Sequence, residues 1–357
     1  MITNTYQLIN SVKKMYPVVQ FFKDRYFPDG KTFYSEEVII EMKKGNKKVA
    51  PFVVPVVNGI AVKAQKYSGY KYTPALIAPK SVITAADLKA KAFGEDPNSG
   101  RSAADRQNEL QAERMDDLRQ QIMRRHELMG AEILTSGKVP MKQYAKSEDF
   151  GTDKFVLQEL TFYDGDKFEN EFVLKTAWAT MKAKDRVKVL YDMAATLRSR
   201  GVRVMDVVLG ANVAVDLFGD EEFLEYFNKK SVNFGTIDPQ ELPEGVVYNG
   251  KINIMGVMLD FFTYDEKYED LDGTEKEFIS SDDIIMLAPG LGETVYGSVD
   301  FVTKEGSVES YAEKIVPRVI PDENNNIITV IESSRPVSYP KDMEGWLVCD
   351  TTVVAQD

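Results

Sequence analysis

The spacing of apolar and polar positions predicts one long helix over residues 103–136. No proline interrupts this stretch, Ser102 with Asp105 fits a capping box at its start, and Gly137 is a typical helix end. At 1.5 Å per residue the helix would be roughly 50 Å long. Its larger apolar residues recur at intervals of three, four or seven positions, which puts them on one narrow face. They are Met115, Leu118, Ile122, Met129 and Ile133.

The remaining faces of this helix carry mostly charged and amide side chains. We expect the narrow apolar face to dock on a hydrophobic core and the polar faces to stay outside one. Two interpretations of the polar faces are open at this point. They are covered by solvent, as in an ordinary amphipathic helix, or by neighbouring chains.

Residues 33–91 are predicted to form strand segments joined by turns. The segments "YSEEVIIEM", "VAPFVVPVV" and "IAVKAQKY" are rich in β-branched and aromatic residues, and the intervening "KKGNKK" and "NG" are turn signals. Prolines recur through this region, which confines its strands to sheet edges or solvated ribbons. Because a two-stranded ribbon is at best marginally stable alone, this region needs a surface to lie on.

A more compact α/β pattern is predicted from about residue 185. An amphipathic helix ends at Gly201, and the buried strand in "VRVMDVVLGANVAVDLFG" leads into a helix that begins near Ala211 and Asn212. Strands and short hairpins are expected in "FLEYFNKK", "INIMGVMLDFFTYDEKY", "DGTEKEFIS" and "DDIIMLAPG". Upstream, "FVLQELTFYDG" and "NEFVLKTAWAT" are predicted to be two strands around a turn, and the apolar "GWLVCDTTVV" is predicted to be the closing strand.

The composition is that of a soluble globular protein with two or more compact units. The chain has 357 residues, of which 43% are hydrophobic and 28% charged. Its N-terminus lacks the basic start and apolar core of a signal peptide, and no stretch is long and apolar enough to span a membrane. We therefore expect a cytoplasmic origin and no membrane partner.

Charge is distributed unevenly along the chain. The net charge of −12 argues against a general nucleic-acid binder, which would need basic side chains to neutralise phosphates. Residues 43–91 nevertheless carry ten lysines and one acid, whereas residues 201–310 carry seven basic and twenty-three acidic side chains. Blocks of opposite sign permit complementary contacts between copies, although two solvated surfaces that never meet are equally compatible with the charges.

Candidate catalytic chemistry is sparse. With one cysteine and one histidine, an internal disulfide or a Cys/His metal site is impossible. His126 lies within the long helix, a poor place for a general base, and Cys349 lies in an apolar run typical of a small buried residue. The Gly-x-Gly of residues 287–299 lacks a P-loop ending, so turn glycines are the better interpretation. We expect no catalytic residue, cofactor or metal, and this favours a structural building block.

The order of these segments resembles the major capsid proteins of lambda-type tailed bacteriophages, the capsid protein E family. The most specific segments are "APFVVPVVNG", "KYTPALIAPKSVITAADL" and the helix ending "MGAEILTSGKV". Downstream, "TAWAT", "FFTYDEKYEDLDGTEKEFISSDDIIMLAPG", "YGSV" and "SSRPVSYPKDMEGWLVCDTTV" follow in the family's order. The resemblance covers nearly the whole chain, and it rests on the ordered set of segments because no single motif is specific.

The resemblance implies an α+β chain with the Hong Kong 97 type of tailed-phage capsid fold. Its expected parts are an N-terminal arm at 1–34, an extended β loop at 35–98, a peripheral domain at 99–185 with 311–357, and an axial α/β domain at 186–310. Residues 103–136 would be the spine helix of the peripheral domain. Family members lay the extended loop across neighbouring subunits, which would give the ribbon its missing surface.

The resemblance also implies a function and a set of partners. The chain would be a non-enzymatic major capsid protein that forms hexamers and pentamers of an icosahedral head shell, enclosing DNA without sequence-specific binding. A separate scaffolding protein, a portal and a decoration protein are the expected partners, and the expected location is the virion after assembly in the host cytoplasm. The hypothesis for inter-subunit contacts comprises basic residues of the loop and the helix. They are Lys43, Lys44, Lys47, Lys48, Lys63, Lys66, Arg119, Arg124 and Arg125.

Two alternatives remain open on the sequence. An encapsulin-like nanocompartment shell would share the fold, and a cytoplasmic α/β enzyme would need a site that the motifs do not reveal.

Overall fold

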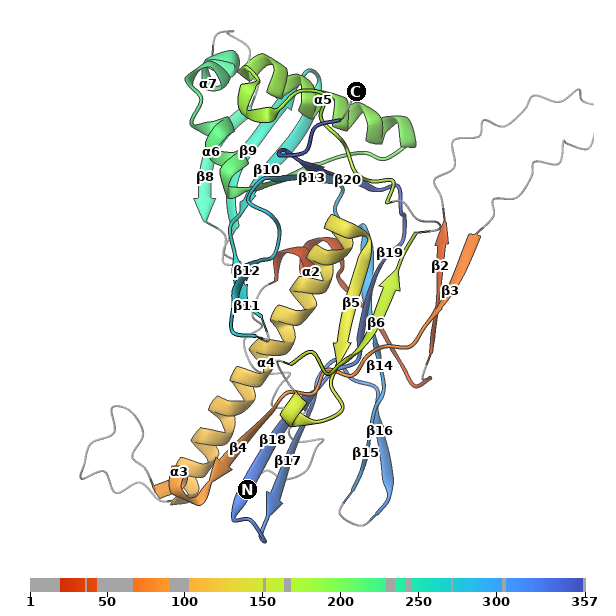
Figure 1. Cartoon of the computed structure of the whole chain (residues 1–357), viewed down its shortest axis with the longest axis vertical. Helices are drawn as coiled ribbons and strands as arrows, with labels where there is room; N and C mark the ends of the chain where they lie inside the picture. Colours follow the sequence, from red (N-terminus) through yellow and green to blue (C-terminus); the bar gives the residue numbers. More distant parts are fainter. Residues whose placement is uncertain are drawn as a thin grey trace, which may run out of the picture.

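The computed structural model has an elongated shape, with a sheet and three helices at one end and a long helix that leads away from them (Figure 1). It describes residues 20–35, 37–43, 67–89, 103–149, 152–163, 168–228, 235–241, 246–270, 272–303 and 306–355. The expected turn "NG", most of the predicted lysine-bearing loop and Ser102 of the expected capping box lie outside these residues.

The long helix α4 spans Ala103–Ser136, as predicted. It ends where Gly137 adopts a left-handed φ of 66°, and a Cβ there would lie 2.8 Å from the Phe168 ring. All five apolar residues of the predicted narrow face are buried. The expectation that the other faces stay outside a core is wrong for the C-terminal half, where His126 and Glu127 are also buried because α2 and other elements pack around them.

A six-stranded mixed sheet forms the centre of the compact end. Only β7 and β10 pair in parallel among its neighbours, and the C-terminal strand β20 joins the sheet beside β13. In spatial order the strands are β20 (Trp346–Asp350), β13 (Asp283–Leu287), β7 (Asp206–Gly210), β10 (Val257–Tyr264), β9 (Val246–Ile254) and β8 (Gly235–Glu241).

This sheet is buried on both faces and belongs to two cores. In β7, Val207 and Leu209 enter one core and Val208 enters the other, and β13 and β20 alternate in the same way. Side chains of successive strand residues point to opposite faces, so one apolar run serves both cores. Helices α5 (Ala183–Arg200) and α6 (Ala211–Phe218) cover the first face, and α2 (Phe21–Tyr26) with the end of α4 covers the second.

Helices α5 and α6 confirm the sequence predictions, whereas α7 corrects one. Helix α5 ends at Gly201 with a left-handed φ of 92°, and α6 begins at Ala211 directly after β7. The segment "FLEYFNKK", predicted among the strands, instead lies largely in helix α7 (Glu221–Asn228). Its aromatic residues favour strands locally, but Phe223 packs edge-on against Phe218 of α6, and this tertiary contact is made from a helix.

Two smaller sheets and several two-stranded ribbons contain the remaining strands of the described residues. One sheet joins β1 (Asp29–Phe33), β14 (Gly292–Gly297) and β19 (Pro336–Pro340), and another joins β17 (Val316–Asp322), β18 (Ile327–Ser333) and β4 (Lys80–Thr84). The two-stranded ribbons in the described part are β2 (Val38–Lys43) with β3 (Tyr67–Tyr72), β5 (Lys138–Gln143) with β6 (Val156–Thr161), β11 (Lys267–Glu269) with β12 (Glu275–Glu277), and β15 (Val299–Val302) with β16 (Val308–Tyr311). Strand β4 lies at a sheet edge, as its flanking prolines predict. The short helix α3 (Ala85–Lys89) follows it.

The predicted strand pair after α4 is also corrected. Strand β6 exists, but its partner is β5, which comes directly after α4 and was not predicted. The segment "NEFVLKTAWAT" contributes only isolated bridges at Glu171 and Leu174 and a short 3-10 helix, Trp178–Thr180. It runs along β20 and the C-terminal residues because long-range pairing there replaces the local hairpin.

Candidate functional site

Helix α2 joins the long helix to the six-stranded sheet. The backbone N–H groups of Phe22 and Lys23 donate to the two carboxylate oxygens of Glu127 on α4, at 2.8 and 2.9 Å. From the other side of α2, Arg25 donates two bonds of 2.7 and 2.8 Å to the fully buried Asp206 at the start of β7. A bidentate, charge-assisted pair of this kind fixes direction as well as distance. Burial raises the pKa of Glu127 to about 7.

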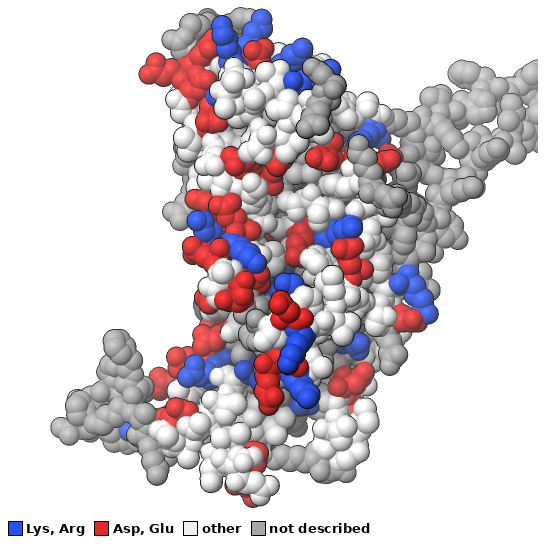
Figure 2. Space-filling view, viewed as in Figure 1, with Lys and Arg blue, Asp and Glu red and all other residues white. Residues whose placement is uncertain are grey.

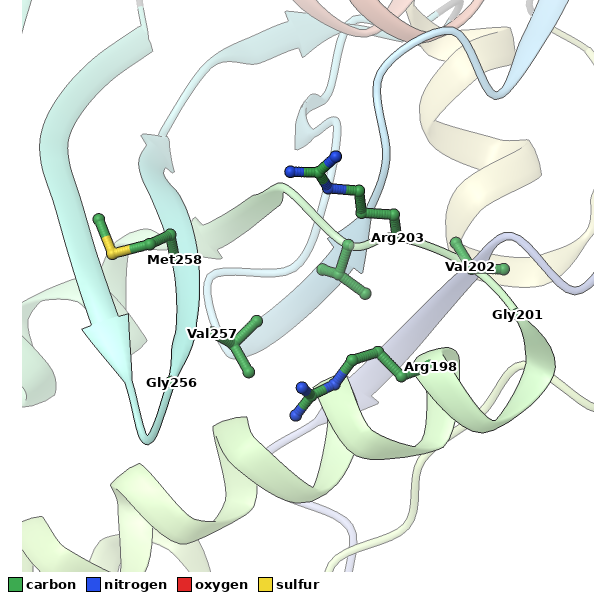
Figure 3. Close-up of a pocket in the computed structure, with 8 residues that line it drawn as sticks. Arg198, Gly201, Val202, Arg203, Gly256, Val257 and Met258 are labelled. Atoms are coloured by element: carbon green, nitrogen blue, oxygen red, sulfur yellow. The ribbon is translucent and has the colours of Figure 1, made fainter.

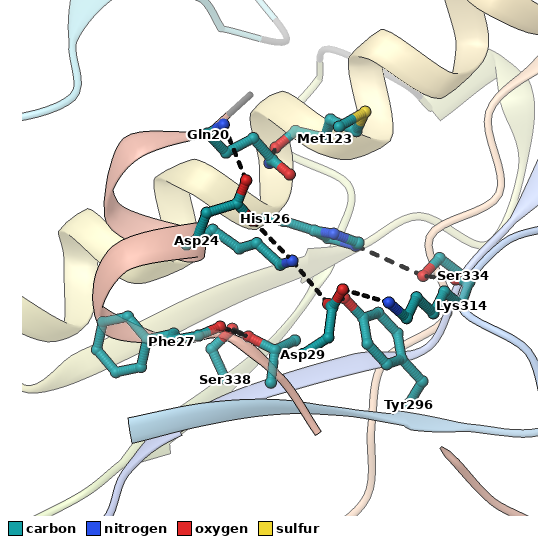
Figure 4. Close-up of polar contacts among 12 residues, drawn as sticks. Gln20, Asp24, Phe27, Asp29, Met123, His126, Tyr296, Lys314, Ser334 and Ser338 are labelled. Atoms are coloured by element: carbon teal, nitrogen blue, oxygen red, sulfur yellow. Dashed lines mark hydrogen bonds and ion pairs between the residues drawn. The ribbon is translucent and has the colours of Figure 1, made fainter. Parts of the chain in front are cut away.

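A polar network next to α2 also connects this helix to the sheet of β1, β14 and β19 (Figure 4). Lys23 Nζ lies 2.6 Å from Asp29, whose carboxylate also accepts from Tyr296 at 2.6 Å and pairs with Lys314. Burial alone would raise the pKa of Asp29, but these hydrogen bonds outweigh it and lower the pKa to about 2. The network thus holds a charged carboxylate where β1, β14 and the chain before β17 meet.

The histidine and the cysteine are both buried in this structure. Burial, assisted by the charge of Lys23, lowers the pKa of His126 to about 3, and the ring lies 3.5 Å from the Ser334 hydroxyl. Burial raises the pKa of the Cys349 thiol to about 12, so the nucleophilic thiolate is strongly disfavoured. Among the described residues no group of His, Cys, Asp or Glu could hold a metal ion.

The predicted contact residues lie in three different environments. Lys43 ends strand β2, but Lys44, Lys47, Lys48, Lys63 and Lys66 lie outside the described residues. Arg119 is only 8% exposed, so little of it is available at a surface. Arg124 is exposed and Arg125 half-buried, next to each other on α4.

The sequence interpretation missed a set of apolar side chains on the ribbons and edge strands. The directly opposed residues Val302 and Val308 of the β15–β16 ribbon are 66% and 69% exposed, and the ribbon projects from the body in Figure 1. Val156 and Leu157 of β6 are 68% and 56% exposed. Successive strand residues point to opposite faces, so the exposure of both Val156 and Leu157 shows that no other described element covers either face of β6 there, and the sequence pattern gives no sign of this.

Acidic and basic side chains are interspersed over the face shown in Figure 2 rather than separated into two large areas. Acidic side chains gather at the upper left, where Figure 1 places α7, whose first turn contains Glu221 and Glu222. Among the described residues no helix has the length and apolar character needed to cross a membrane.

Comparison with known proteins gives one family match and several structural matches. The family model for phage major capsid protein E matches residues 4–349. No curated protein matches the chain.

Three solved structures show the same fold at low sequence identity. A prophage capsid protein from Escherichia coli CFT073 has 19% identity and a TM-score of 0.64, with 99% of this chain and 100% of that chain covered. The capsid of cyanophage P-SCSP1u has 9% identity and a TM-score of 0.54, covering 96% and 90%. The mature capsid of bacteriophage PhiM1 has 10% identity and a TM-score of 0.50, covering 94% and 88%.

These matches confirm the predicted α+β fold of the Hong Kong 97 capsid type. The family and the fold are those of structural capsid proteins and not of an enzyme, which excludes the enzyme alternative, and the family match favours a phage capsid protein over an encapsulin-like shell. Because the family model spans nearly all of the 357 residues, this chain belongs to the phage major capsid protein E family.

Proposed function

We propose that many copies of this chain assemble as pentamers and hexamers of an icosahedral phage head shell that encloses DNA. The observation that supports this most directly is that two-stranded ribbons leave large apolar side chains exposed, including Val156, Val302 and Val308. Isolated ribbons are marginally stable, and exposed apolar surface of this kind typically marks an interface. A neighbouring copy would support the ribbons and cover their exposed apolar side chains.

The energetic logic is that of many modest contacts. A standard interface buries roughly 1,600 Å² in total, and a subunit in a closed shell shares several interfaces. Each contact can therefore be weak while the closed shell is durable.

We assign the parts of the chain as the family resemblance implies. The proposal takes 1–34 as the arm, 35–98 as the extended loop, 99–185 with 311–357 as the peripheral domain, and 186–310 as the axial domain. The pairing of β20 with β13 means that the C-terminal segment would also supply a strand to the axial sheet.

In this proposal the basic residues of the loop and of α4 contact neighbouring copies. Lys43, Lys44, Lys47, Lys48, Lys63 and Lys66 would meet acidic surface on the next subunit, and Arg124 offers an exposed guanidinium with no hydrogen bond or ion pair to the described residues. Burial leaves Arg119 a smaller direct part in such a contact.

The further partners rest on the family resemblance alone. They are a separate scaffolding protein, a portal and a decoration protein, with assembly in the host cytoplasm. The net charge of −12 supports enclosing DNA without tight binding to it, because a chain with an excess of acidic side chains neutralises few phosphates. Tight, salt-sensitive DNA binding by purified shells would contradict this part.

Electron microscopy and sedimentation of the purified full-length chain test the proposal. We expect shells or capsomers, and we expect deletion of residues 43–67 to leave a folded chain, by circular dichroism, that forms no shells. A fully ordered monomer at high concentration would overturn the function. Intact shells from the deletion would overturn only the role of the loop.

A further inference from the structure

A groove of about 520 Å³ opens at the end of α5, between that helix and the start of β10 (Figure 3). It is lined by Arg198, Gly201, Val202, Arg203, Val204, Gly256, Val257 and Met258. Figure 3 shows Val257 between the two arginines, one on α5 and one on the loop that follows. The groove is therefore apolar at its centre and basic at its rim.

The basic rim contrasts with its surroundings. Arg203 is one of only seven basic residues in the segment 201–310, which has twenty-three acidic ones. It is exposed and has no hydrogen bond or ion pair with the described residues. Arg198 lies 5.7 Å from the centre of the Tyr191 ring, which orients its guanidinium along α5. A cation left without a partner in an acidic unit is available to an acidic group from outside.

Methionines extend the apolar surface next to the groove. Met205, Met255 and Met258 are 41%, 47% and 47% exposed. Met255 forms the tight turn between β9 and β10 with a φ of 49°, beside Gly256 of the groove. Flexible methionine side chains adapt to the shape of an apolar partner.

A surface of complementary character lies at the elbow between α6 and α7. Val215 of α6 is 71% exposed, and Glu221 and Glu222 are exposed at the start of α7. The elbow is fixed to the rest of the chain, because Trp178 donates to Asp216 at 3.1 Å and Arg186 contacts Asp220 at 3.4 Å. The elbow thus presents an apolar knob with two carboxylates in a fixed position.

The groove and the elbow lie at opposite ends of α5. Arg186, in the first turn of that helix, contacts the elbow, and Arg198, in the last turn, lines the groove. A helix of 18 residues is roughly 27 Å long. A chain therefore cannot place its own elbow in its own groove, although two copies can.

We propose that the elbow of one copy docks into the groove of the next, with Val215 against the valines and Met258, and Glu221 and Glu222 facing Arg203. This contact deepens the proposed function and rests on it. Because the two surfaces differ, the interface is head-to-tail, and such an interface closes a ring when five or six equal rotations complete a turn, as a pentamer or hexamer requires.

Charge reversal tests this contact. Arg203→Glu should raise the concentration needed for assembly at least tenfold, by sedimentation and electron microscopy, with an unchanged thermal unfolding midpoint. Combining Arg203→Glu with Glu221→Lys and Glu222→Lys should restore assembly, because the charges are complementary again. Lys188→Glu, an exposed residue in the middle of α5, is the matched control and should assemble normally.

The outcomes separate the two proposals. A wild-type chain that forms no rings or shells overturns the proposed function and this contact with it. Wild-type shells together with normal assembly of Arg203→Glu overturn only the contact. Impaired assembly that the elbow reversal fails to rescue also overturns it, and then the groove receives another acidic segment.

Discussion

Several buried carboxyl groups make the folded chain bind protons more tightly than the unfolded chain. Burial raises the pKa of Glu127, Glu132 and Asp283 to about 7, with Asp350 adding to the effect at Asp283. Burial also raises the pKa of Glu332 to about 8, and both of its carboxylate oxygens lack hydrogen-bond partners. An acid with a raised pKa contributes stability at low pH, and this contribution is lost as the pH rises through the folded-state pKa.

We predict that the unassembled chain is most stable in mild acid. Its free energy of unfolding should fall as the pH rises from about 5 to 8, by on the order of 1.4 kcal/mol for each unit by which a pKa is raised. Stability should fall again in strong acid, below about pH 4, because the pKa of Asp29 is lowered to about 2. Denaturant unfolding between about pH 3 and pH 8 measures both losses of stability, the one above pH 5 and the one below pH 4.

The variant Glu332→Gln tests the contribution of one carboxyl group to this pH dependence of stability. The variant should show a shallower loss of stability between pH 5 and 8 than the wild type, whereas Glu113→Gln on the exposed face of α4 should match the wild type. Equal slopes for Glu332→Gln and the wild type would contradict the assignment.

Gly130 allows α2 to lie close against α4. A Cβ at this position would lie 3.2 Å from Phe22 Cβ and 3.4 Å from Phe27 Cδ2. We predict that Gly130→Val lowers the free energy of unfolding by about 1–3 kcal/mol, because its methyl groups overpack this contact. The exposed Ala112→Val on the same helix measures the cost of a β-branched side chain without the packing contact, and a loss in Gly130→Val that is no larger than in Ala112→Val would contradict the overpacking.

At the scale of elements, the spacing of apolar residues and the glycines at helix ends were sufficient to predict several helices. Helices α4 and α5 lie where their spacing and end glycines place them, and β7 leads into α6 as predicted. The prediction was wrong where tertiary contacts outweigh local preference, as for α7, or where a strand has a long-range partner, as for the segment around Leu174. Local periodicity contains no information about either contact.

The neighbouring residues Arg124, which is exposed, and Arg125, which is half-buried, provide a test at this scale. Arg124→Glu with Arg125→Glu should impair shell assembly, measured by sedimentation, more than it lowers the thermal unfolding midpoint of the unassembled chain. The reason is that Arg124 has no hydrogen-bond or ion-pair partner among the described residues, whereas the charge of Arg125 only partly offsets the rise that burial causes in the pKa of Glu132. Equal losses of assembly and stability would instead identify an ordinary intramolecular helix, and Lys188→Glu again serves as the control.

At the scale of the whole molecule, the sequence predicted the fold class and the family but not the surfaces. The pairing of β1 with β14 joins residues more than 250 positions apart, and that of β20 with β13 joins residues about 60 positions apart, so neither can be derived from local patterns. The groove and the elbow show the opposite relation, because their residues are close in sequence but far apart in the structure. Arg203 and Val215 are close in sequence, yet β7 and α6 carry the chain from one end of α5 to the other between them.

The central strands set a limit on how the subunit can come apart. Each of β7, β13 and β20 supplies alternate side chains to both cores. One core therefore cannot unfold while these three strands remain paired in the other. A destabilising substitution in the core on the α5 side therefore also perturbs the strands that form the core on the α4 side. We therefore expect the α5 side and the α4 side of this sheet to unfold together rather than one after the other.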